Sequence, residues 1–238
     1  MGKKERNVGP KGMVEATTTL RSDNRTSAHQ LRPPTTTLSP LSRSDGSARF
    51  SFGGSAVLAS VYGPKEVKLR DEQLDVATVE VLFRPLIGLS GTTERLYEKT
   101  LREIVEGVVL RYLHPRTCVQ VTLQVMSDDG CILSCAINAA ILALLDAGVA
   151  LKNMVASVTC VIDQEGQLLL DPSAKEAKEA ASTHIFTFDN VTDDIVNVVS
   201  MGVYSVENYK SACELAQQAC ASIQAVYRQT LEEKINKA

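Results

Sequence analysis

The chain has 238 residues, of which 44% are hydrophobic and 22% charged, and it contains no tryptophan. This composition is typical of one good-sized globular domain and excludes two large ones. The net charge of −3 is divided unevenly, because residues 1–48 carry eight Lys or Arg residues against four acids, which leaves −7 for the remainder. A uniformly basic nucleic-acid binder is therefore excluded, and any contact with RNA or DNA has to come from a local patch.

The first part of the chain shows little sign of regular structure. Residues 1–30 are polar and lack periodicity, which predicts a disordered basic tail, whereas residues 31–238 form the predicted domain. Residues 31–46, rich in Pro, Ser and Thr, are predicted to be an extended lead-in without an element of their own. From Ser47 the pattern changes to two strands joined at Gly53-Gly54, which is a hairpin signal.

Alternating and helical patterns then follow in turn. Residues 75–85 alternate as a strand that Pro85 ends, and a helix is predicted from an N-cap at Thr92 or Thr93 to Pro115. Residues 118–126 alternate perfectly between apolar and polar side chains, which predicts another strand.

The segment Ser134 to Ala147 is apolar almost all round, and such a helix has to be covered on every side. We expect it to be the central core helix, between a sheet and a second helix. Four further strands are predicted before a terminal helix that begins near Glu207, with an apolar stripe at Leu215, Ala219, Ile223, Val226 and Leu231. The predicted fold class is α+β, with mixed sheets packed around the central apolar helix.

Targeting and redox signals are sparse. The six cysteines lie in apolar or helical segments without a CxxC pair, and no histidine has metal-ligand spacing. Buried free thiols are therefore favoured over disulfides or zinc. The N-terminal segment lacks the apolar run of a secretory signal, and no apolar stretch reaches the roughly 18 residues that cross a bilayer. We expect no membrane contact and a place in the nucleus or cytoplasm.

Four strings, in this order and at these intervals, resemble the RNase PH family. They are QLRP at 30–33, GSARFSFGGSAVLASVYGP at 46–64, SDDGCILSCAINAAILALLDAG at 127–148 and LLLDPSAKEAKEA at 168–180. The match covers about residues 21–235. The resemblance implies an RNase PH-like domain in a six-membered ring around an RNA channel, in a family whose active members degrade RNA from its 3′ end with inorganic phosphate.

This chain departs from the phosphate-binding motif of the family. Active members read Asp-Gly-Gly-Thr-Arg-Thr-Ala, where small residues, the Arg and the helix N-terminus hold phosphate. Here the aligned residues include Asp129, Gly130 and Ser134, but Ile132 replaces the first Thr and Leu133 replaces the Arg. Aliphatic groups donate no hydrogen bond to an anion. The resemblance therefore implies a degenerate phosphate pocket at Asp129, Gly130, Leu133 and Ser134.

A second departure concerns the acidic motif, Leu-Asp-x-x-Tyr-x-Glu-Asp in active members. Asp171 and Glu176 are present, but Ala177 occupies the position of the last acid. No catalytic residue and no cofactor is therefore expected. As an alternative, Asp171, Glu176 and Glu179 could hold Mg²⁺ for nucleic-acid hydrolysis, or phosphate could still serve as co-substrate. The competing interpretation is that the two glutamates belong to a solvated, charge-balanced segment.

RNA contact is a separate expectation, carried by basic residues after the third strand of the family fold. The corresponding residues are Arg84, Arg95 and Lys99. The alternative is a solvated helix face on which Glu94, Glu98 and Lys99 form i,i+4 pairs.

The resemblance as a whole implies a non-catalytic, RNA-binding ring subunit of the RNA exosome that supports 3′–5′ RNA processing, including that of rRNA. The implied partners are other RNase PH-like ring subunits, RNA-binding cap proteins and single-stranded RNA. The implied locations are nucleus, nucleolus and cytoplasm. A homodimer, and a nuclease active in its own right, remain the alternatives.

Overall fold

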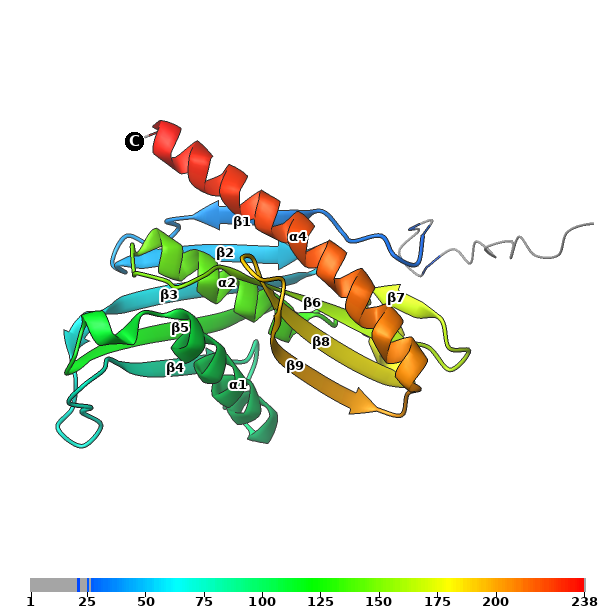
Figure 1. The fold of residues 1–238 in the computed structure, drawn as a ribbon, viewed down its shortest axis with the longest axis horizontal. Helices are drawn as coiled ribbons and strands as arrows, with labels where there is room; N and C mark the ends of the chain where they lie inside the picture. Colours follow the sequence, from blue (N-terminus) through cyan, green and yellow to red (C-terminus); the bar gives the residue numbers. More distant parts are fainter. Residues whose placement is uncertain (1–20, 22–24, 26, 238) are drawn as a thin grey trace, which may run out of the picture.

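The computed structural model describes residues 21, 25 and 27–237, and their strands form two sheets (Figure 1). The first sheet has the order β1-β2-β3-β5-β4, in which β4 and β5 are parallel and the other neighbours antiparallel. Its strands are β1 Pro34–Leu38, β2 Gly46–Phe52, β3 Ser55–Glu66, β4 Thr78–Arg84 and β5 Thr117–Ser127. The second, antiparallel sheet has the order β7-β6-β8-β9. Its strands are β6 Val155–Ile162, β7 Leu168–Leu170, β8 Ser182–Asp189 and β9 Ile195–Gly202.

Helices join and cover the two sheets. They are α1 Thr92–Val108, the 3-10 helix η1 Arg111–Leu113, α2 Ile132–Asp146, α3 Ala174–Glu179 and α4 Val206–Lys237. Helix α4 runs along the second sheet, where it contacts β6 and β8, and its C-terminal half reaches β1 of the first sheet (Figure 1). The predicted α+β class with mixed sheets around a central apolar helix is confirmed.

Helix α2 is the centre of the core. Every residue from Leu133 to Leu144 is buried, and burial of each large aliphatic side chain stabilises the fold by about 1.5–3 kcal/mol. The helix contacts β2, β3 and β5 of the first sheet and β6 and β8 of the second. The Asn138 side chain donates to the Ser157 carbonyl at 2.9 Å and accepts from the Ser157 N–H at 2.8 Å. The central position is as predicted, but the two sheets, rather than one sheet and a second helix, provide most of the cover.

The lead-in expected at residues 31–46 contains a strand. Strand β1 pairs with β2 in antiparallel register from Pro34 opposite Phe52 to Leu38 opposite Ala48. The prediction that this segment has no element is wrong. Its side chains alternate only between half-buried and exposed, so the strand is stabilised by the β2 ladder more than by an apolar face of its own.

The predicted boundary between tail and domain at residue 31 is too late. Arg21 and Arg25 are only 7% and 8% exposed, and both contact residues near the end of β7. Residues 27–30 of the expected tail are also described, whereas residues 1–20, 22–24 and 26 lie outside the described residues. Polar composition predicts solvent exposure, and it fails here because these two arginines have acceptors far along the chain.

Helix α1 begins and ends earlier than expected. Its N-cap is Gly91 rather than Thr92 or Thr93, and the Glu94 carboxylate accepts from the Gly91 N–H at 2.7 Å. The helix ends at Val108, and η1 occupies part of the interval to Pro115.

The buried face of α4 is offset from the predicted stripe. Leu215, Val226 and Leu231 are only partly buried, whereas Ala219 and Ile223 belong to the buried face as expected. That face consists of Ala212, Ala216, Ala219, Cys220, Ile223 and Tyr227. Small residues and Tyr227, rather than leucines, therefore fit closest to the sheet.

Two predicted features of the apolar segments can be checked in the described residues. Of the six cysteines, which all have free thiols, five are buried and Cys213 is half-buried. No helix in the described part of the chain has both the length and the apolar character of a bilayer-spanning segment.

Candidate functional site

The acidic turn between β5 and α2 packs closely against the segment that follows β7. Gly130 has φ +98°, and a Cβ at this position would lie 3.0 Å from the backbone carbon of Ser173 and 3.1 Å from the backbone nitrogen of Ala174. Both the positive φ and the close approach require glycine. The Asp129 N–H donates to the Ser55 hydroxyl at 2.9 Å, which ties the turn to β3.

A cavity of about 240 Å³ lies beside the start of α2, and Gly130 and Leu133 belong to its wall. The described residues of the wall are Tyr97, Asp128, Gly130, Ile132, Leu133, Thr159, Thr183, Ile185, Val199 and Met201. Among them there is no lysine, arginine or histidine, and the one carboxylate belongs to Asp128. Burial raises the pKa of Tyr97, and the charges of Asp128 and Glu94 raise it further, so the phenol stays neutral. None of these side chains therefore offers an anion a positive charge, and the Asp128 carboxylate opposes one.

The polar groups of Asp129 and Ser134 have partners within the protein and do not line the cavity. One Asp129 carboxylate oxygen accepts from Arg32 Nη1 at 2.5 Å and the other accepts from the Ala174 N–H at 3.1 Å. The Ser134 hydroxyl is buried, donates to the Cys131 carbonyl at 3.0 Å and accepts from Thr159 Oγ1 at 2.9 Å.

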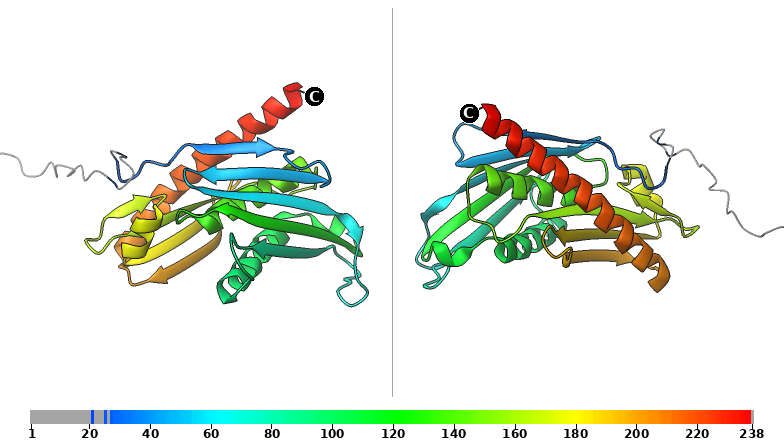
Figure 2. Two further views of the ribbon diagram at one scale, coloured as in Figure 1. Left: turned by 180° about the vertical axis from the view of Figure 1, so that it is seen from behind. Right: turned by 45° about the horizontal axis from the view of Figure 1, so that its top comes forward.

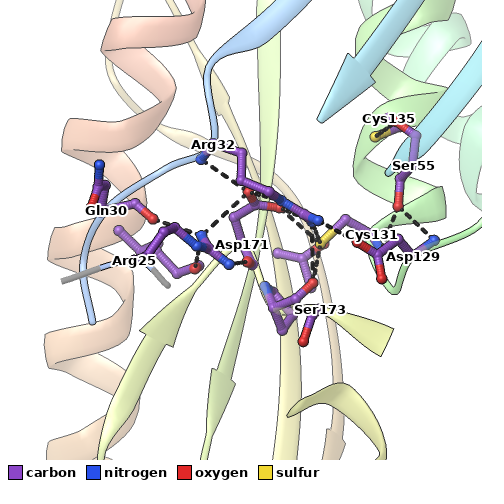
Figure 3. Close-up of polar contacts among 12 residues, drawn as sticks. Arg25, Gln30, Arg32, Ser55, Asp129, Cys131, Cys135, Asp171 and Ser173 are labelled. Atoms are coloured by element: carbon purple, nitrogen blue, oxygen red, sulfur yellow. Dashed lines mark hydrogen bonds and ion pairs between the residues drawn. The ribbon is translucent and has the colours of Figure 1, made fainter. Parts of the chain in front are cut away.

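Arg32 joins the acidic turn to the end of β7 (Figure 3). Its Nε donates to Asp171 Oδ2 at 2.6 Å and its Nη2 donates to Asp171 Oδ1 at 2.7 Å, a bidentate arrangement. A third bond reaches Asp129 from Nη1. Burial acts to lower the pKa of Arg32, but the hydrogen bond and charge of Asp171 outweigh it and raise that pKa above its ordinary value.

Asp171 is the acceptor on which this cluster converges. It is 1% exposed and has φ +51°, a conformation that is uncommon for a residue with a side chain. Its backbone carbonyl accepts from Arg21 Nη2 at 3.1 Å and Arg25 Nη2 at 2.7 Å. The Cys131 thiol donates to Asp171 Oδ1 at 3.2 Å. Burial, and after it the charge of Asp171, raise the pKa of Cys131 well above its ordinary value, so this donor stays protonated.

Glu176 is bound on the same side of the cluster. Its carboxylate accepts from Arg21 Nη2 at 2.8 Å, from Arg21 Nε at 3.2 Å and from the Ser173 N–H at 2.9 Å. Burial acts to raise the pKa of Glu176, but the hydrogen bonds from Arg21 and Ser173 prevail and lower it to about 2. The carboxylate is therefore ionised at every physiological pH.

The three carboxylates of the metal alternative are not arranged as ligands. Asp171 binds Arg32 and Glu176 binds Arg21, whereas Glu179 is exposed at the last position of the short helix α3. In the described part of the chain, no group of three or more His, Cys, Asp or Glu residues could hold a metal ion. The competing interpretation of a solvated segment is wrong for Glu176 and fits Glu179.

The basic residues expected to contact RNA differ in availability. Arg84, the last residue of β4, and Arg95, in the first turn of α1, are exposed, and neither forms an ion pair with a described residue. Lys99 lies 3.8 Å from Glu103, one turn further along α1. The predicted pairing of Glu94 and Glu98 with Lys99 is wrong. The carboxylate of Glu98 instead accepts from the Phe83 N–H at 2.9 Å.

Sequence reasoning missed the roles of Arg21, Arg25 and Arg32. The first two fall in the segment predicted to be a tail, and Arg32 stands in the QLRP string without an assigned function. Apart from the carbonyls of Ala28 and Gln30, their acceptors lie 97 to 155 positions away along the chain. A buried charge needs a partner, but no local pattern in the sequence indicates which one.

The fold is that of a known class of RNA-degrading proteins. Residues 30–150 match domain 1 of the 3′ exoribonuclease family, RNase PH, and residues 153–219 match its domain 2. The chain belongs to the RNase PH family, as the four sequence strings indicated.

Within this family, several relatives cover most of the chain. A protein named exosome complex exonuclease RRP46 homolog from Arabidopsis thaliana is 34% identical over 235 residues, which covers 92% of this chain and 98% of the relative. The crystal structure of rice (Oryza sativa) Rrp46 has a TM-score of 0.83 at 37% identity, and the match covers 89% of this chain and all of the rice chain. A chain of the Archaeoglobus fulgidus exosome with RNA bound to the active site has a TM-score of 0.75 at 18% identity and covers 87% of this chain and 92% of its own, which shows the shared fold.

We expect Arg32→Gln to lower the free energy of unfolding by about 3–5 kcal/mol, because Asp171 would remain buried without its bidentate partner. Urea denaturation at neutral pH measures this loss. Arg70→Gln is the matched control, since the Arg70 side chain is 94% exposed, and it should change the value by less than about 0.5 kcal/mol. Equal stability of the two variants would contradict the structural role of Arg32.

We expect Glu176 to contribute to the loss of stability of the folded protein at acidic pH. Its pKa is lowered from 4.5 to about 2 in the folded protein, so its stabilising effect is complete above about pH 4.5 and is lost as the pH falls towards 2. We therefore expect Glu176→Gln to be less stable than the parent at pH 7, with a difference that shrinks between pH 4.5 and 2. The exposed Glu179→Gln is the control and should show no such convergence when unfolding is followed by circular dichroism.

Proposed function

We propose that this protein is a non-catalytic, RNA-contacting subunit of an exosome ring, which supports 3′–5′ RNA processing and degradation, including that of rRNA. Its partners would be other RNase PH-like ring subunits, RNA-binding cap proteins and single-stranded RNA, in the nucleus, nucleolus and cytoplasm. Family membership supports this proposal, together with the Arabidopsis and rice relatives named RRP46 and the exosome in which an archaeal relative occurs with RNA.

The observation that carries the non-catalytic assignment is the composition of the cavity beside α2. A phosphate-binding site needs cations or free donors, and here Ile132 and Leu133 occupy the wall next to the Asp128 carboxylate. The acids that remain are also unsuited to proton transfer, because Asp171 and Glu176 form ion pairs with Arg32 and Arg21. The family scaffold is kept and the groups for phosphorolysis are lost.

RNA contact is assigned to Arg84 and Arg95. Exposed guanidinium groups that have no carboxylate partner among the described residues are available to phosphate oxygens, and such contacts position RNA without reading its sequence. Lys99 would contribute less, because it forms an ion pair with Glu103.

We expect the double variant Arg84→Glu/Arg95→Glu to weaken binding of an unstructured single-stranded RNA. The slope of log affinity against log salt should become shallower by about 1.4, or about 0.7 for each lost phosphate contact. Fluorescence anisotropy over a salt series measures both quantities. Arg70→Glu/Arg228→Glu makes the same change in net charge at two exposed residues elsewhere and should leave the slope nearly unchanged. A common response of both double variants would contradict a local RNA site.

The homogeneous protein should not shorten an RNA oligomer from its 3′ end, with inorganic phosphate, with Mg²⁺ or with chelator, because the cavity does not favour phosphate. An active phosphorolytic RNase PH enzyme, assayed in parallel, is the positive control, and a mass measurement in solution separates monomer, homodimer and larger assemblies. Phosphate-dependent shortening would contradict the proposal. Mg²⁺-dependent shortening that Glu176→Gln or Glu179→Gln abolishes would establish the metal alternative.

A further inference from the structure

The first sheet has one face that no described helix covers. Helices α1 and α2 pack against β4, β2 and β3 on the inner face, where alternate side chains of these strands are buried. Seen from behind, in the left panel of Figure 2, the first sheet faces the reader and no helix lies in front of it. The residues between the buried ones, such as Arg49 and Gln124, project to this outer face.

Strand register places two arginines in one row across this face. Arg49 of β2 pairs with Leu58 of β3, Leu58 pairs with Gln124 of β5, and Gln124 pairs with Arg84 of β4. Directly paired residues project to the same side of a sheet. Thr37 of β1 extends the row beyond Arg49. Arg49 and Arg84 are therefore three strand spacings apart, which is about 14 Å.

The charges of this outer row are available to a ligand. Arg49 and Arg84 are exposed, and neither forms an ion pair within the described part of the chain. Within the strands, the acid nearest to the row is Glu80, which is half-buried and pairs with Gln120, four positions before Gln124 on β5. The Gln124 amide donates to the Pro85 carbonyl at 3.1 Å. This bond holds the start of the loop between β4 and α1 against the end of the row.

We propose that the row Thr37, Arg49, Leu58, Gln124 and Arg84 is a second contact surface for single-stranded RNA, continuous with the site at Arg84 and Arg95. This inference rests on the proposed function, because it takes RNA as the ligand. The guanidinium groups of Arg49 and Arg84 bind phosphates, and the Thr37 hydroxyl offers a hydrogen bond to sugar and phosphate oxygens. The Gln124 amide nitrogen donates to the Pro85 and Val125 carbonyls, so its oxygen is the group that can accept from a ribose 2′-hydroxyl.

The chemistry of the face favours RNA over a protein partner. Its large apolar side chains, among them Leu58, Tyr62 and Leu82, are separated by hydroxyl, amide and guanidinium groups. A stable protein interface has a more apolar centre with charged residues depleted from it. An open polar sheet with spaced cations matches the phosphate backbone of a strand that crosses it.

The test is RNA binding by Arg49→Glu. Arg49 is exposed, so we expect unchanged thermal unfolding, an affinity for an unstructured oligouridylate about fivefold lower, and a salt slope shallower by about 0.7. Arg49→Gln should show a smaller loss in the same direction. Arg70→Glu, with the same charge change on a loop, is the matched control. Affinity should also rise less steeply with oligouridylate length in Arg49→Glu than in the parent.

The outcomes separate this proposal from the proposed function. If Arg84→Glu/Arg95→Glu weakens binding while Arg49→Glu behaves like Arg70→Glu, the sheet-face proposal fails and the first RNA site stands. If the parent binds no RNA, or if the Arg84/Arg95 variant binds normally, the proposed function itself fails. If Arg49→Glu leaves RNA binding intact but prevents assembly with RNase PH-like subunits, the face is a protein interface and the proposal is overturned.

Discussion

The buried ion pair between Arg32 and Asp171 is the constraint on which the arrangement of the site depends. Burying a charge is costly unless hydrogen bonds and an opposite charge compensate for it, and each of these two groups supplies that compensation to the other. The pair also spans the chain, because Arg32 precedes the first sheet and Asp171 follows β7 of the second. Through Asp129, the same guanidinium fixes the turn that begins α2. The positive φ of Asp171 is tolerated because both its carboxylate and its carbonyl are held by arginines.

This constraint gives the acids Asp171 and Glu176 a structural role. An acid can exchange protons only if its pKa lies near the working pH, whereas Arg21 and Ser173 lower the pKa of Glu176 to about 2. The Asp171 carboxylate accepts two guanidinium bonds and a thiol bond, so it has little capacity left for water or a metal. The same acids therefore act as acceptors that hold the two halves of the domain together. Leu133 and Ile132 line the cavity beside the start of α2, and their aliphatic side chains donate no hydrogen bond to an anion.

Much of the fold could be predicted from the sequence because the signals were local. The apolar segment around Ala136–Leu145 lacks a polar face, and residues 118–126 alternate strictly, so α2 and β5 followed directly. Strand β1 could not be predicted in this way, because it depends on pairing with β2 rather than on its own periodicity. Helix α3 has only six residues, too few for a periodic signal. The arginine cluster was beyond local patterns altogether, since its acceptors are distant in sequence and its first members lie in a polar segment.

Burial separates two groups of arginines in this protein. Arg21, Arg25 and Arg32 are buried against carboxylates and carbonyls, so their charge is neutralised within the fold. Arg49, Arg84 and Arg95 are exposed, so their charge can act on a ligand from outside. The overall charge of −3 hides this division, because it counts both groups alike and adds the acids of the remaining surface. A polyanion responds to the local field within about one Debye length, roughly 8–10 Å, and not to the sum. An acidic protein can therefore guide RNA, provided that exposed arginines lie along one path, as the β4 end and the row across the first sheet allow.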